Sequence, residues 1–186
     1  KNATCRPGCY EIRKKLIQGL HADKGEDSMY LKVTWRKEHE QQINFLAHLA
    51  KSTFCLQPAG DTVTRKSFYD SIRMGCIPVV FRQDELFLEQ LAFSNVIPYQ
   101  DLWVYIPETD IREGKNFTAT LRSIDKKTIL EKRRAIYKYR SYLTFPSSST
   151  KDQIEHEGGV SFNVKNEPFP ADALSLSLRN LQSSFF

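Results

Sequence analysis

The chain contains none of the short motifs that identify the common nucleotide-dependent enzymes and hydrolases. It has no GxxxxGKS/T phosphate-binding loop and no GxGxxG dinucleotide fingerprint, so neither an ATPase nor a classical dehydrogenase is supported. It also lacks a GxSxG nucleophile elbow and an HExxH metalloprotease helix. Any chemistry must therefore be sought outside these frequent enzyme classes.

Long apolar runs are absent as well, and none could span a membrane. The chain shows neither a starting Met nor a signal peptide, and we therefore expect it to be an excerpt of a longer protein. Its 186 residues, 40% of them hydrophobic, suffice for one domain with a sizeable core.

The net charge is only +5, from 27 basic and 22 acidic residues, which favours anionic ligands weakly. The densest basic cluster spans 126–140, and we interpret it as the solvated face of a helix. A polyanion-binding module is the alternative that this cluster leaves open. We expect no nucleic-acid partner, because such binders show a stronger charge bias and a recognisable motif.

The most informative stretch is 54–81, FCLQPAGDTVTRKSFYDSIRMGCIPVVF. A short apolar run at 54–56 predicts a strand, and the loop formers at 59–62 follow it. Apolar residues four apart predict a helix over 64–74. The apolar run 77–81 predicts a second buried strand. A strand that leads through a loop into a helix is how open α/β sheets build a ligand crevice.

The first turn of this predicted helix is basic. Thr64 is the candidate N-cap, and Arg65 and Lys66 follow it. Cations are unfavourable at the positive end of a helix dipole unless an anion is bound or solvent screens them. One interpretation is a diphosphate at the helix end, with Asp70 one turn later to hold ribose hydroxyls. The other is that Asp70 simply pairs with Lys66 or Arg73 on the helix surface.

The rest of the chain alternates helices with strands. We expect a half-buried strand over 29–35 and strands over 96–99 and 103–106. Helices are predicted over 9–21, 37–51, 86–91, 117–124 and 128–142, and a final one over 171–181. This order predicts an α/β fold with a Rossmann-like parallel sheet and flanking helices.

The four cysteines form no CxxC pair and have no zinc-ligand spacing with the four histidines. Cys55 and Cys76 lie beside the two strands of the central stretch. They would form a disulfide in an oxidising compartment and would be small core residues in a reducing one. Asn2 and Asn116 begin N-glycosylation sequons, which are compatible with a secretory-pathway protein.

The segments FCLQPAGD, TR and FYDSIRMGCIPVVF resemble the signature of the exostosin-like glycosyltransferases. The similarity is to the branch that decorates plant cell-wall polysaccharides, such as xyloglucan galactosyltransferases and arabinosyltransferases. Weaker resemblance continues at 121–124 and 172–179. It implies the C-terminal, donor-binding half of a two-domain, GT-B type enzyme. That half would comprise a nucleotide-sugar-binding domain over 1–146, a polar linker or insertion over 147–170 and a C-terminal helix over 171–186 that packs back on the domain.

The resemblance implies inverting transfer of a sugar from a UDP-sugar to a polysaccharide or glycan acceptor. Arg65, with the backbone N–H groups of 63–66, would stabilise the leaving diphosphate. Asp70 would hold the ribose. The other donor-binding residues that we predict are Gln57, Gly60, Asp61, Thr62, Thr64, Lys66 and Ser67. No Asp-X-Asp triplet occurs, and we expect neither a metal nor a cofactor.

The general base would lie in an acceptor-side domain upstream, so this chain alone should bind UDP without transferring sugar. The family resemblance also implies a type II membrane protein of the Golgi lumen, with its anchor outside this sequence. Other glycosyltransferases are further partners that the resemblance allows. The alternative is a catalytically silent relative that acts as a lectin-like or scaffold subunit.

Overall fold

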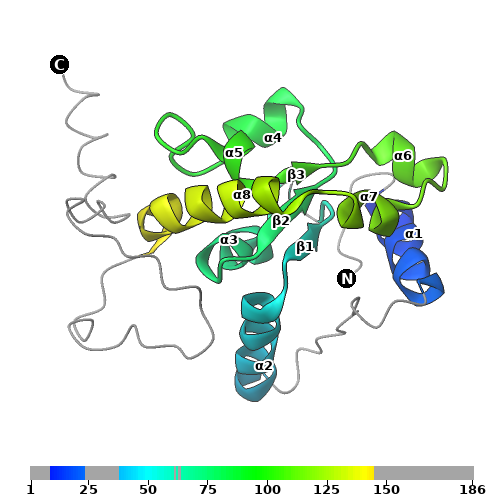
Figure 1. Ribbon diagram of the computed structural model, residues 1–186, viewed down its shortest axis with the longest axis horizontal. Coiled ribbons are helices and arrows are strands. Elements are labelled where there is room, and N and C mark those ends of the chain that lie inside the picture. The colour runs from blue at the N-terminus through cyan, green and yellow to red at the C-terminus, as the bar shows by residue number, and fades with distance from the viewer. Residues whose placement is uncertain (1–8, 24–37, 61, 63, 145–186) are drawn as a thin grey trace.

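The computed structural model describes residues 9–23, 38–60, 62 and 64–144 (Figure 1). The predicted strand over 29–35, the linker and the C-terminal helix lie outside the described residues. The undescribed residues also include Asn2, Asp61 and Val63, and both ends of the predicted linker, 147 and 170.

A three-stranded parallel sheet forms the centre of the described part of the chain. Its strands are β1 (Phe54–Gln57), β2 (Ile77–Val80) and β3 (Val104–Tyr105), in the order β1-β2-β3. Phe54 lies opposite Ile77, and Val79 lies opposite Val104. The two strands predicted from the central stretch are therefore neighbours, and the α/β class with a parallel sheet is confirmed.

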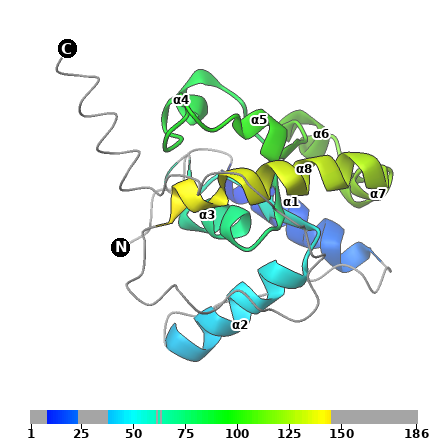
Figure 2. The ribbon, with the colours of Figure 1, turned by 60° about the vertical axis from the view of Figure 1, so that its left-hand side comes forward.

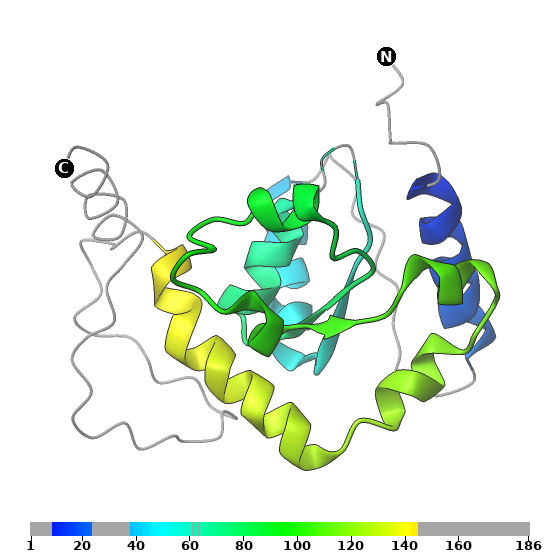
Figure 3. The same cartoon turned by 90° about the horizontal axis from the view of Figure 1, so that it is seen from above.

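Helices cover both faces of this sheet. One core on the first face is shared by α3 (Lys66–Arg73), α4 (Glu85–Glu89), α5 (Tyr99–Leu102) and α8 (Lys126–Tyr139). In Figure 2, α4 and α5 lie on the opposite side of α8 from α3. On the other face lie α1 (Cys9–Ala22), α6 (Glu108–Arg112) and α7 (Phe117–Arg122) (Figure 3). The helix α6 was not predicted.

Strand β2 divides the interior into two cores. Val80 packs with Phe68 of α3 and Ile136 of α8. Val79 and Phe81 pack instead against α1 and α7. Successive side chains of a strand point to opposite faces, so one short apolar strand supplies both cores.

Pro78 is tolerated within this central strand because of where its missing N–H would point. Ile77 donates its N–H to Thr53 O on the β1 side, at 3.0 Å. Adjacent residues direct their backbone groups to alternate edges, so the nitrogen of Pro78 faces β3. Pairing with β3 begins only at Val79, so no ladder hydrogen bond is lost there.

Two local predictions are wrong. Helix α3 begins at Lys66, and its N-cap is Arg65 rather than Thr64, because Arg65 keeps an extended backbone (φ −134°, ψ 153°). The strand predicted over 96–99 is a turn followed by α5. Phe93 adopts a φ of 56°, and its carbonyl accepts N–H bonds from Val96 and Ile97, which hold this segment out of the sheet.

Other boundaries agree closely with the predictions. The predicted helices over 37–51 and 117–124 are α2 (Glu38–Lys51) and α7. The helix predicted over 128–142 is α8 followed by a 3-10 turn, Arg140–Leu143. The strand predicted over 103–106 is the shorter β3. Asp84 caps α4 by accepting the N–H of Phe87, so that helix begins slightly before 86.

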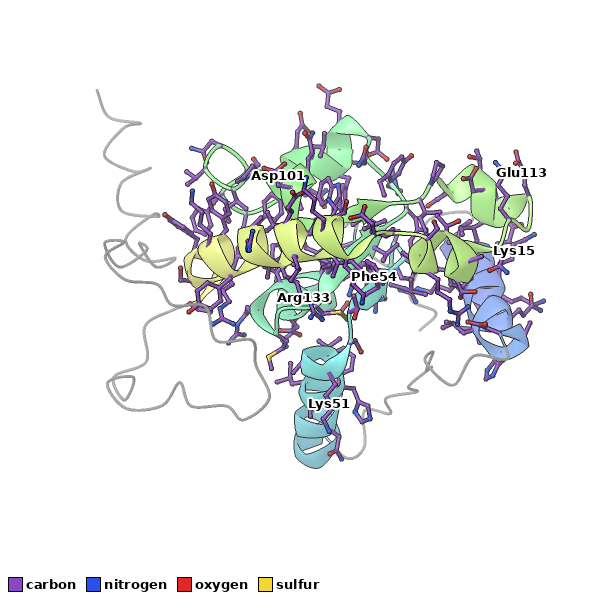
Figure 4. All side chains as sticks on the ribbon, in the orientation of Figure 1. Lys15, Lys51, Phe54, Asp101, Glu113 and Arg133 are labelled. Atoms are coloured by element: carbon purple, nitrogen blue, oxygen red, sulfur yellow. A yellow bond between two sulfur atoms is a disulfide. The ribbon has the colours of Figure 1, made fainter. Side chains whose placement is uncertain are left out.

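Cys55 and Cys76 form a disulfide, with their Cα atoms 6.0 Å apart. This bond decides between the two alternatives that the sequence left open. Leu49 of α2 packs on it. Arg133 of α8 donates to Ser52 O just after α2, at 3.4 Å, so a cation lies at the negative end of that helix (Figure 4).

Candidate functional site

The candidate site is the loop that follows β1 at the carboxyl edge of the sheet. The strand ends at Gln57, residues 58–60 continue the loop, and α3 begins at Lys66. Ligands of open α/β sheets bind outside the carboxyl ends of the strands. The loop therefore lies where a nucleotide would be expected.

Two arginines converge on this loop at Gly60. A Cβ atom placed on Gly60 would lie 2.7 Å from Nη2 of Arg13 and 3.0 Å from Nε of Arg65. Arg13 also donates from Nε to Ala59 O, at 3.1 Å. Two guanidinium groups from distant parts of the chain thus meet beside one glycine, and guanidinium groups are frequent partners of phosphate and carboxylate anions in proteins.

Helix α1 brings Arg13 to the loop because its other side chains anchor it. Ile12 and Leu16 are buried against the sheet. Lys15 donates to Arg112 O of α6 at 2.8 Å, and Arg112 pairs with Glu11 (Figure 4). Sequence reasoning missed Arg13, since a polar residue beside buried positions of an amphipathic helix carries no local sign of function.

Hydrogen bonds between Gln57 and Ser67 connect the end of β1 to α3. Oε1 of Gln57 accepts the hydroxyl of Ser67 at 2.8 Å, and Nε2 donates to Ser71 Oγ at 2.6 Å and to Ser67 O at 3.2 Å. A carboxamide has two N–H donors, and both are engaged here. The structure thus shows these two residues in a structural role, and their contact with a donor substrate stays a prediction.

Asp70 is the buried carboxylate of α3, only 5% exposed. Its Oδ2 lies 2.7 Å from Nζ of Lys66, and its Oδ1 lies 3.9 Å from Nη1 of Arg73. A carboxylate this buried needs charged or hydrogen-bonding partners. The ion pairing that the sequence allowed is therefore present, and the ribose contact stays a prediction.

The two described threonines of the loop, Thr62 and Thr64, hold each other. The hydroxyl of Thr62 donates to Thr64 O, and Thr62 O accepts the N–H of Gly60 at 3.2 Å. These bonds connect both threonines to the loop that carries Gly60. Thr64 therefore supports the loop and does not cap α3.

Asn116, the second sequon residue, is the N-cap of α7. Its Oδ1 accepts the N–H of Ala119 at 3.0 Å and the hydroxyl of Thr118 at 2.8 Å. The residue is exposed. Its glycosylation stays a prediction.

In the part of the chain that the structure describes, no cluster of three or more His, Cys, Asp or Glu residues has an arrangement that could hold a metal ion. No described helix combines the length and the apolar character needed to cross a membrane.

The exostosin GT47 domain matches residues 4–122, more than half of the chain. Similar proteins of Arabidopsis thaliana carry transferase names. A probable xyloglucan galactosyltransferase, GT13, is 31% identical over 77% of this chain and 31% of its own length. A second one, GT12, is 35% identical over 53% of this chain and 19% of its own. The probable arabinosyltransferase ARAD1 is 28% identical over 79% of this chain and 32% of its own.

The chain thus spans at most about a third of the length of these relatives. The matched domain includes α1, the β1 loop and α3, which together carry both arginines of the candidate site. The chain belongs to the exostosin GT47 family of glycosyltransferases.

Proposed function

We propose that this chain is the donor-binding part of an inverting glycosyltransferase that uses a UDP-sugar and a glycan acceptor. Family membership supports glycosyl transfer, and the names of the relatives suggest a plant cell-wall polysaccharide as acceptor. The observation that carries the proposal is the pair of guanidinium groups, from Arg13 and Arg65, at Gly60.

In the proposed reaction, an acceptor hydroxyl oxygen attacks the anomeric carbon while the bond to the diphosphate oxygen breaks. The diphosphate leaves with the bonding electron pair, and its negative charge grows in the transition state. Preorganised donors aimed at such developing charge are usually the largest catalytic term. Arg13 and Arg65 supply that stabilisation, and no metal is required for it.

The proposal also assigns the remaining roles. Asp70 holds the ribose hydroxyls from the first turns of α3, and Lys66 stays close to it at 2.7 Å. The proton of the acceptor hydroxyl passes to a general base in an upstream domain. The Golgi lumen is the proposed compartment, since the disulfide Cys55–Cys76 suits an oxidising environment.

The test is a calorimetric titration with UDP, and with GDP and UMP for comparison. The wild type should prefer UDP to both, because UMP lacks the second phosphate. Arg13→Ala and Arg65→Ala should each weaken UDP binding by about tenfold or more, corresponding to about 1.4 kcal/mol. Arg134→Ala is the matched control, since it removes an exposed arginine of α8 and should leave UDP affinity unchanged.

If the folded protein with its upstream domain restored binds no UDP, the transferase proposal is wrong. That result would favour the silent lectin-like or scaffold subunit. Sugar transfer by the isolated chain would contradict the placement of the general base upstream.

A further inference from the structure

A groove lies between α8 and β3, the strand at the opposite end of the sheet from β1. Its main part has a volume of about 580 Å³ and is lined by Gln83, Gln100, Trp103, Tyr105, Thr128 and Lys132, among others. A neighbouring cavity of about 350 Å³ shares Thr128 and Lys132 with it and adds Asp101 and Glu131. Because Thr128 and Lys132 line both cavities, the two adjoin each other beside the first half of α8.

The lining of the main part suits a neutral, hydroxyl-rich ligand. Tyr105 is 42% exposed, which leaves an amphipathic ring available for packing. Gln83 and Gln100 are exposed carboxamides, which both donate and accept hydrogen bonds. Among the described residues that line this part, none carries a carboxylate. Pockets with aromatic walls and a few convergent polar groups are typical binding sites for small ligands.

Among the described residues that line the two cavities, Lys132 is the one cation, and its ammonium group is restrained. Lys132 donates from Nζ to Gln100 O, at 3.4 Å. Burial lowers the pKa of its ammonium group, and the carboxylate of Asp101 opposes that shift. An ammonium that is partly desolvated and already directed at a carbonyl is a poor anion site, so the groove differs in character from the arginine pair at Gly60.

The groove and the arginine pair reach the same edge of the sheet. Tyr105 ends β3, Gln83 follows β2, and the loop with Gly60 follows β1. Neighbouring strands lie about 4.8 Å apart, so β3 is about 10 Å from β1 across the sheet. A chain of sugar rings in the groove could therefore place its end near a sugar held at Gly60.

We infer that this groove is a subsite for the acceptor glycan, with Tyr105 as its aromatic platform. The inference rests on the proposed function and adds a location: part of acceptor recognition lies on this chain as well as upstream. The ligand class is a neutral oligosaccharide, whose ring face packs on Tyr105 while its hydroxyls bind Gln83 and Gln100.

The test titrates the full-length protein with a neutral xylosylated β-glucan oligosaccharide, and separately with UDP. Tyr105→Ala should weaken oligosaccharide binding at least fivefold and leave UDP affinity unchanged. Tyr105→Phe keeps the ring and should bind nearly as the wild type does. Tyr137→Ala is the matched control, because Tyr137 of α8 is 39% exposed and lines neither cavity.

The outcomes separate this inference from the proposed function. The acceptor subsite would be wrong, and the donor site would still hold, if the protein binds UDP but shows no saturable binding of the oligosaccharide. The same conclusion follows if Tyr105→Ala and Tyr137→Ala lose equal oligosaccharide affinity. Oligosaccharide binding that depends on Tyr105 without any UDP binding would overturn its acceptor role. Oligosaccharide and UDP binding that respond to separate variants would support both.

Discussion

Arg13 of α1 and Arg65 at the start of α3 contact the same glycine. A Cβ on Gly60 would come within 2.7 Å of one guanidinium and 3.0 Å of the Nε of the other. No local sequence pattern links these two arginines. Their meeting depends on the packing of α1 against a face of the sheet, which brings Arg13 to the loop that follows β1.

Gly60→Ala is expected to weaken UDP binding about tenfold with little loss of stability. The added methyl group must displace both arginine side chains, but these are flexible ends that can move without disturbing the core. Calorimetry gives the affinity, and thermal unfolding gives the stability.

Gly114→Ala serves as the opposite control for this change. Open space surrounds Gly114, but its φ of +76° is unfavourable for any residue with a Cβ. This variant should lose stability and keep its UDP affinity. The same UDP affinity in Gly60→Ala and wild type would argue against an anion between the two arginines.

Gln57→Leu is expected to lower the free energy of unfolding by about 1–3 kcal/mol, because it strips the hydroxyls of Ser67 and Ser71 of their shared partner. It should also weaken UDP binding if the predicted donor contact exists. Ser71→Ala removes one of these hydrogen bonds but keeps the side-chain amide of Gln57, so it should lower stability without changing UDP affinity. Urea unfolding and calorimetry on both variants make the comparison. If Gln57→Leu binds UDP as tightly as the wild type does, Gln57 does not contact the donor.

Removal of the disulfide is expected to destabilise the protein by about 3 kcal/mol, since the bond closes a loop with a sequence separation of 21. The double variant Cys55→Ala, Cys76→Ala should unfold at lower denaturant than the oxidised wild type. A reducing agent should shift the unfolding midpoint of the wild type toward that of the variant. Identical unfolding midpoints with and without reductant would show that the bond does not form.

Lys132→Met is expected to stabilise the protein at pH 7, and by less at about pH 10.5. Burial lowers the pKa of Lys132 in the folded state below its unfolded value, so the folded state disfavours the charged form. That cost is fully present below the folded pKa and disappears as the pH rises above the unfolded pKa, about 10.4.

Urea unfolding of wild type and variant at the two pH values measures this difference. Lys132→Arg is the control, because an arginine stays charged over the whole range and gives no relief at high pH. A stability difference between Lys132→Met and wild type that grows with pH would contradict the desolvation of Lys132.

Local patterns account for much of the fold. The apolar runs at 54–56 and 77–81, with apolar residues four apart between them, were enough to predict β1, α3 and β2, but they left open whether Cys55 and Cys76 form a disulfide. The same reasoning failed at 96–99, because Ile97 is buried by a turn rather than by a strand. An apolar residue in the sequence indicates burial, but it does not indicate whether a strand, a helix or a turn buries it.

Local patterns likewise predicted one part of the candidate site, and the packing of distant elements decided the other part. The sequence by itself determined that a loop with Gly60 and Arg65 lies between a buried strand and a helix, since spacing and helix chemistry are encoded within a few residues. Only the tertiary structure decided that Arg13 joins them, that Asp70 is buried between two cations, and that Tyr105 lines a groove. Those relations depend on how distant elements pack, and packing is settled by contacts between residues that no local pattern connects.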